Sequence, residues 1–220
     1  PGTYMYHSGT RMELQIEMGM VGALIVRPAG LANRAYNHAD TQFDHEYLFL
    51  LTSMDPTIHE LAEMGRFDEI DVTAYFPVYW FVNGRAAPDD LADAFVAWLP
   101  HQPYNSRPRM TPGQKVLMRI IGAGQQQHPF HFHGNNADII ARDGRMLASS
   151  AISGPDLKSS RFTTLTVPGE TVDQIFTWTG EKMGWDIYGT GPDFEHSCNG
   201  ISVNDPSPAS AGFDPVTHEY

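Results

Sequence analysis

Short extended runs that follow Pro-Gly turns constrain the fold of this 220-residue chain more than any other pattern. Pro-Gly occurs at positions 1, 112 and 168, each time before a run of β-favouring residues. The dipeptide suits a tight turn, because proline fixes φ and glycine accepts a positive φ. The sequence therefore predicts many short strands and an all-β sandwich or barrel. We expect strands at 4–7, 20–26, 46–51, 79–82, 114–121, 138–141, 162–167 and 171–178.

Two short helices are expected between these strands. Asp55 and Pro56 form a strong helix start, with the aspartate as N-cap and proline at the first helical position. Apolar residues then recur at helical spacing until Gly65. A second helix is predicted over residues 89–98, where Leu91, Phe95 and Trp98 would share one side. Both are interpreted as insertions between strands.

The net charge of the chain excludes some classes of partner, and its cysteine content excludes an internal disulfide. The chain has 14 basic and 26 acidic residues, a net charge of −12. This acidity argues against nucleic acid and anionic membrane surfaces as partners. No uninterrupted apolar run reaches the length of about 18 residues that indicates a membrane span. Cys198 is the only cysteine, so no internal disulfide is possible.

The stretch 128–134, His-Pro-Phe-His-Phe-His-Gly, holds three histidines in six residues among β-favouring neighbours. In a strand, side chains alternate between the two faces. His131 and His133 would then share one face, and His128 would point to the other. Neutral imidazole is a ligand for borderline metals such as copper and zinc. The stretch therefore predicts one strand that serves two metal sites.

This stretch also resembles the His-Pro-x-His-x-His-Gly motif of multicopper oxidases, laccase-like enzymes built from cupredoxin domains. A second stretch, Gly-Thr-Tyr-Met-Tyr-His-Ser-Gly at 2–9 followed by Gly-Met-Val-Gly-Ala-Leu-Ile-Val at 19–26, resembles the family's Gly-Thr-x-x-Tyr-His-Ser-His segment and the strand that closes its first domain. The resemblance implies an all-β chain of cupredoxin-like Greek-key sandwich or barrel domains with short helical insertions.

The resemblance also suggests a division of the chain. Residues 1–30 would be the closing strands of a first cupredoxin-like domain, and residues 31–45 a linker. Residues 46–180 would form a second, incomplete cupredoxin-like domain, and residues 181–220 a loop-rich C-terminal segment. Because the chain opens in mid-motif without an initiator Met, we expect it to be part of a longer protein.

Carried onto this sequence, the family's ligand roles imply copper sites of two kinds. His128 would bind a mononuclear type 1 copper, which takes electrons from the substrate. His131, His133 and His7 would bind a trinuclear type 2/3 cluster that reduces dioxygen to water. His7 is then expected within a few ångströms of His131 or His133. No catalytic residue is predicted beyond these metal ligands.

The implied activity is the one-electron oxidation of a small reducing substrate, phenolic or a metal ion, coupled to dioxygen reduction. Family resemblance also implies a periplasmic or extracellular location, and a homo-oligomer is one of the expected states. Two alternatives stay open. A copper nitrite reductase would use a histidine-only site in place of the cluster. A degenerate cupredoxin-like protein would keep the fold and serve assembly without catalysis.

Departures from the family pattern support the second alternative. Gly9 stands where the family has a second cluster histidine. The family's His-Cys-His motif is absent, and Cys198 lies beside His196 at a different spacing. We therefore expect the missing motif to lie beyond residue 220 rather than at Cys198.

Overall fold

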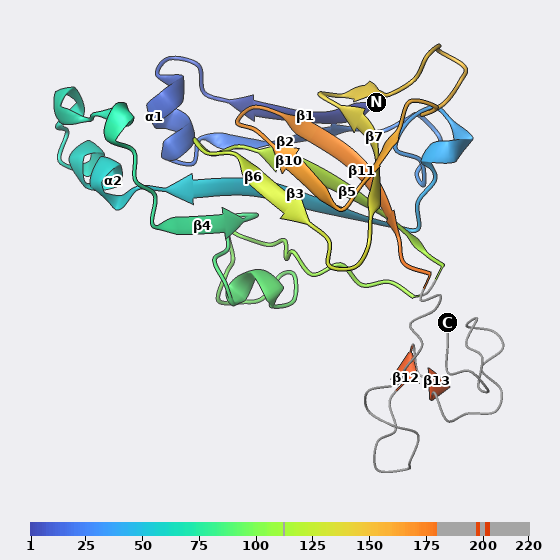
Figure 1. Cartoon of the computed structure of the whole chain (residues 1–220). Helices are drawn as coiled ribbons and strands as arrows, with labels where there is room; N and C mark the ends of the chain where they lie inside the picture. Colours follow the sequence, from blue (N-terminus) through green and yellow to red (C-terminus); the bar gives the residue numbers. More distant parts are fainter. Residues whose placement is uncertain (112, 180–196, 199–200, 203–220) are drawn as a thin grey trace.

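A central seven-stranded sheet forms the body of the protein in the computed structural model, which describes residues 1–111, 113–179, 197–198 and 201–202. Its path runs β4 (Tyr79–Val82), β3 (His45–Met54), β5 (Lys115–Gly122), β11 (Thr171–Thr177), β7 (Ala137–Arg142) and β8 (Arg145–Met146), and β9 (Ser159–Arg161) also pairs with β7. The β3–β5 pair is parallel, and the other pairs are antiparallel. The expected all-β fold is confirmed (Figure 1).

Three two-stranded sheets accompany the central one. β1 (Gly2–His7) pairs with β2 (Val21–Val26), and β6 (His128–His131) pairs with β10 (Thr163–Thr166). β12 (Ser197–Cys198) pairs with β13 (Ile201–Ser202). The helices are α1 (Met12–Glu17) and α2 (Pro56–Glu63), with short 3-10 turns at Ala39–Thr41, Phe67–Glu69, Val72–Ala74 and Asp89–Leu91. No helix in the described ranges has the length and apolar character that crossing a bilayer requires.

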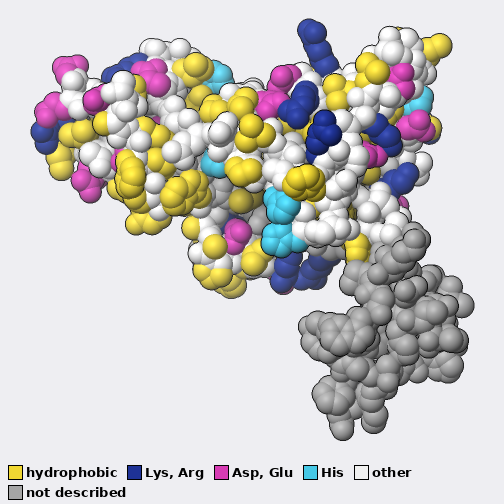
Figure 2. Space-filling model, in the orientation of Figure 1, with side chains coloured by type: hydrophobic (Ala, Val, Ile, Leu, Met, Phe, Trp, Pro, Cys, Tyr) yellow, Lys and Arg dark blue, Asp and Glu magenta, His cyan; other side chains and the backbone are white. Residues whose placement is uncertain are grey.

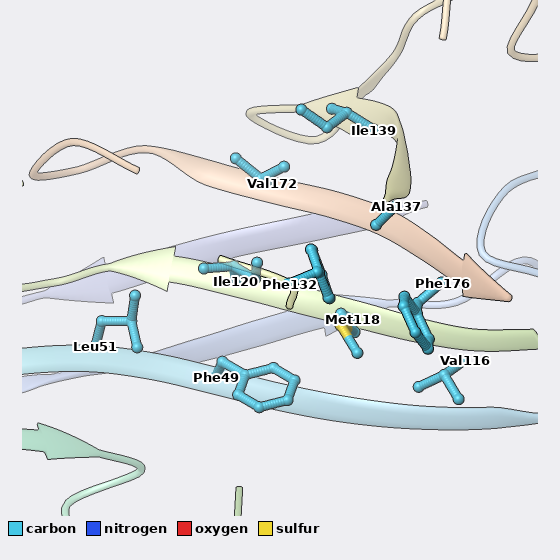
Figure 3. Close-up of a cluster of buried hydrophobic side chains, with 10 residues drawn as sticks. All are labelled: Phe49, Leu51, Val116, Met118, Ile120, Phe132, Ala137, Ile139, Val172 and Phe176. Carbon is cyan, nitrogen blue, oxygen red and sulfur yellow. The ribbon is translucent and has the colours of Figure 1, made fainter. Parts of the chain in front are cut away.

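The central sheet is covered on both faces, because β5 alternates between two hydrophobic clusters. Val116, Met118 and Ile120 point into the larger cluster, to which β3, β7 and β11 also contribute side chains (Figure 3). Phe132, just after β6, closes this cluster by stacking on Phe176 with ring centroids 5.2 Å apart. The strand with the histidine motif is thus held against the core by its own aromatic residues.

On the other face Leu117 packs in a second cluster with Ala35, Tyr36 and Phe43. These three residues belong to the segment predicted as a linker, and they are buried. The division into domains itself stays a prediction.

A buried polar network ties the β1–β2 hairpin to this second face. Asp173 of β11 accepts hydrogen bonds from the hydroxyls of Thr3 and Tyr36, the latter at 2.6 Å. Arg119 of β5, which is fully buried, donates to Thr3 at 2.9 Å and to Glu46 at 2.6 Å. The guanidinium also lies 3.4 Å from the Asp173 carboxylate. Burial, and then the neighbouring carboxylate of Asp173, raises the pKa of the Tyr36 hydroxyl.

One predicted helix is confirmed and one is wrong. α2 begins after Asp55, whose carboxylate accepts the amide N–H of Thr57 at 2.9 Å, and Gly65 follows its end with a φ of 71°. Residues 89–98 form only the 3-10 turn Asp89–Leu91. The buried side chain of Arg85 donates to the carbonyl oxygens of Asp89, Ala92 and Asp93 in this segment, and to that of Gln102 just beyond it. Those carbonyls face a guanidinium instead of helical N–H groups, so the helix does not form.

Candidate metal centre

The antiparallel pairing of β6 with β10 sets the direction of each side chain in the histidine motif. His128 lies opposite Thr166, and His131 lies opposite Thr163. His128 and Phe130 are half-buried, whereas Pro129 and His131 are exposed. Phe130 meets the ring of Phe49 edge-on at 4.9 Å, which places the inner face of β6 on the core. His128 and His131 therefore lie on opposite faces of the strand, as the alternation predicts.

His131 and His133 form an exposed imidazole pair on the outer face. Their ring centroids are 5.1 Å apart. The Nδ1 of His131 lies 2.8 Å from the carbonyl oxygen of Phe162. Because a carbonyl can only accept, Nδ1 carries the proton and Nε2 keeps its lone pair. A backbone carbonyl commonly orients metal-binding histidines in this way.

His128 has a different environment on the inner face. Its Nε2 is buried and has no hydrogen-bond partner within the described part of the chain. The hydroxyl oxygen of Thr166, across the β6–β10 pair, is buried and unpartnered as well. Burial lowers the pKa of the His128 imidazole. The ring is therefore neutral at neutral pH, which is the form that binds metals.

His7 lies apart from this strand, at the end of β1. Its Nδ1 donates to the carbonyl oxygen of Ser8 at 2.9 Å, which again leaves Nε2 with a lone pair. The imidazole lines a groove of about 510 Å³ that includes neither His131 nor His133. Among the residues that the structure describes, no three His, Cys, Asp or Glu side chains form a group that could hold one ion. The structure therefore does not bring His7 together with His131 and His133.

Gly9 and Cys198 were the other two positions that the sequence analysis considered for the site. Gly9, where the family has a histidine, has open space where a side chain would start. Cys198 lies in β12, but its side chain is outside the described residues, as is His196. Sequence reasoning missed the orienting role of Phe162, because a backbone carbonyl leaves no residue-type signal.

These residues fit copper in part. The unpartnered nitrogen of His128 and the paired, oriented rings of His131 and His133 are suitable imidazole donors. Each face supplies fewer than the three or four protein ligands typical of a stable site. As copper ligands, these histidines would form two partial sets rather than one complete site.

Comparisons with known proteins bear on the family resemblance and on the fold. Residues 94–177 match the family model for multicopper oxidases. A blue copper oxidase from Nitrosomonas europaea is similar with a TM-score of 0.57 and 22% identity, over 80% of this chain and 45% of that one. The multicopper oxidase mgLAC is similar with a TM-score of 0.56 and 23% identity, over 80% and 45%. A search of curated proteins found no match.

A copper nitrite reductase from Nitrosomonas europaea is also similar, with a TM-score of 0.50 and 18% identity over 82% of this chain and 54% of that one. At these identities the likenesses show the fold alone. The chain spans less than half the length of the two oxidase structures. On the family match over residues 94–177 and the shared cupredoxin-like fold, the resemblance to multicopper oxidases that the histidine motif predicted is confirmed.

Proposed function

We propose that the chain is part of a copper-dependent oxidoreductase of the multicopper oxidase type. It would oxidise a small reducing substrate, phenolic or a metal ion, by single electrons, and pass them to dioxygen. The observation that carries this proposal is a single strand with one half-buried imidazole on its inner face and an exposed pair on its outer face. Copper would supply the one-electron redox chemistry that the side chains lack.

The two faces suggest different tasks for the protein's own residues. His128 offers a neutral nitrogen in partly dry surroundings, beside the apolar core, and we assign it to the type 1 site. His131 and His133 offer two oriented nitrogens at the surface, and we assign them to the trinuclear site. The outer pair needs further ligands, which we propose come from another domain or from a second copy of the chain in a homo-oligomer. A periplasmic or extracellular location is part of the same proposal.

Exposed apolar side chains on the outer face of the β6–β10 pair support the proposal that another domain or subunit covers it. Phe162 and Leu165 expose 61% and 45% of their surface beside the imidazole pair. Phe162 meets the His131 ring edge-on at 5.7 Å. Exposed apolar side chains around incomplete ligands are typical of a surface that another protein covers. Covering this face would exclude water from the metal ligands.

The test is copper content, measured by mass spectrometry on the full chain within its intact protein. His131→Ala/His133→Ala should lower the copper content while sparing the site at His128, and His128→Ala should do the reverse. His101→Ala, a change at an exposed histidine, is the matched control and should keep all the copper. Equal copper content in all four proteins would refute the ligand assignment. A wild-type protein without copper would support a degenerate structural role.

A nitrite reductase is the second candidate, favoured by the structural likeness to that class. Dioxygen consumption and nitrite consumption, each measured with the same electron donor, separate the two. Reduction of nitrite without reduction of dioxygen would replace the oxidase proposal.

A further inference from the structure

The groove beside His7 contains an unusual set of donor atoms. It lies between β1, α1 and the segments 123–125 and 168–169, and has a volume of about 510 Å³. The residues that line it include two methionines, a histidine and two acidic residues: Met5, Met12, His7, Glu13 and Asp143. No Lys or Arg occurs among the described residues that line it. The groove is therefore acidic and rich in soft donors.

The direction of β1 places two of these donors on the same face. Thr3, Met5 and His7 alternate along the strand and so point to one side. Thr3 is fully buried against Arg119 and Asp173, which shows that this side faces the central sheet. The pairing of β1 with β2 runs from Gly2 to His7, so the strand is held in this orientation along its whole length.

α1 forms another part of the lining and contributes Met12, the third proposed ligand. Met12 is its first residue, and the side chain of Gln125 donates to the backbone carbonyl of Glu13 at 2.6 Å. This contact ties α1 to the segment that follows β5. His7 contributes a free lone pair, because its Nδ1 proton is used at the Ser8 carbonyl. Core filling does not explain Met12, since 51% of its surface is exposed.

We propose that this groove binds a soft monovalent metal ion, Cu(I) or its redox-inert equivalent Ag(I), through Met5, Met12 and His7. Thioether sulfur favours soft ions, and imidazole suits copper. The nearby carboxylates favour a cation electrostatically without being required as ligands. Neither His131 nor His133 lines the groove, so His7 would here have a role other than the cluster ligand that the family resemblance implies. The proposal does not depend on the proposed oxidase chemistry.

The experiment is a titration of the metal-free full chain with silver nitrate, followed by calorimetry and by the ¹³C-methyl resonances of the methionines. The protein carries Cys198→Ser, because a thiol would compete for silver. One equivalent should shift the resonances of Met5 and Met12. Met5→Leu/Met12→Leu should weaken binding at least as much as the roughly 10- to 100-fold that losing an orienting partner costs at metal sites. His7→Ala should weaken it in the same range.

The matched control is Met18→Leu/Met20→Leu, which removes two thioethers from the neighbouring groove between α1 and α2. This variant should bind silver as the unaltered protein does. Unchanged affinity in Met5→Leu/Met12→Leu, or an equal loss in the control, would overturn the proposal. Far-ultraviolet circular dichroism checks that each variant is folded, and the His7→Ala variant provides the test if the double variant is not. His131→Ala/His133→Ala should keep the silver site, so failure of the oxidase proposal remains distinguishable.

Discussion

Asp173→Asn should lower the free energy of unfolding more than neutralising a carboxylate in an exposed ion pair. Asp173 is 2% exposed and accepts the hydroxyl hydrogens of Thr3 and Tyr36. Asparagine keeps the shape but offers only one carbonyl acceptor, so one of the two hydroxyls faces an amide NH₂. The change also leaves Arg119 with Glu46 as its remaining carboxylate partner.

The expected loss of stability follows from the burial of both Arg119 and Asp173. Removing one member of a buried ion pair costs about 3–5 kcal/mol when the other charge is left uncompensated. Here Glu46 still compensates part of the charge on Arg119, which reduces the expected loss to about 2–4 kcal/mol. For a protein of this size, a loss of about 3 kcal/mol corresponds to a fall in Tm of roughly 6–12 °C.

The assay is urea-induced unfolding monitored by circular dichroism, together with a thermal scan. Asp138→Asn is the matched control, since Asp138 pairs with Lys158 at 2.6 Å in a contact where the lysine side chain is 51% exposed. That exposed pair should contribute under about 1 kcal/mol. If Asp173→Asn lost no more free energy of unfolding than Asp138→Asn, the reasoning from the buried network would be wrong.

Three further changes and one control substitution test the fold by the same unfolding assay. Phe132→Ala should lose about 3–5 kcal/mol, because it removes the aromatic ring that closes the larger cluster; a loss below 1 kcal/mol would contradict that packing. Asp55→Ala should lose about 1–2 kcal/mol by removing the cap of α2, and an unchanged midpoint would show that the cap is not needed. Gly122→Ala should lose about 1–3 kcal/mol, because its new methyl group would collide with the backbone of Val167. Gly9→Ala, which meets open space, should differ little from the original protein, and equal effects of the two glycine changes would refute the steric argument.

The strands could be predicted because their signals are local. The strand expected at 79–82 matches β4 in full, and the strand expected at 171–178 differs from β11 by one residue. α1 was missed because it has only six residues and Arg11 makes no capping contact through its side chain. The helix predicted at 89–98 is absent because Arg85, which precedes the segment, binds backbone carbonyl oxygens within it. Such contacts leave no periodic pattern in the sequence.

In the candidate site, too, local features could be predicted from the sequence and long-range ones could not. The opposite directions of His128 and His131 follow from strand alternation alone. The position of His7 does not, because it depends on where Thr3 of the same strand docks, and that docking joins residues far apart in the chain. The metal-ligand roles of all four histidines, including His133, stay predictions.

The contact between Thr3 and Asp173 spans 170 positions of the chain. During synthesis at about 5–20 residues per second, the β1–β2 hairpin would wait roughly 10–30 s before its docking partner on β11 exists. Throughout that interval the hairpin lacks its contacts with Asp173 and Thr171, and Arg119 of β5 is the partner of Thr3 that is synthesised first. A slow step in refolding, with the hairpin docking last, is the expected counterpart in the test tube.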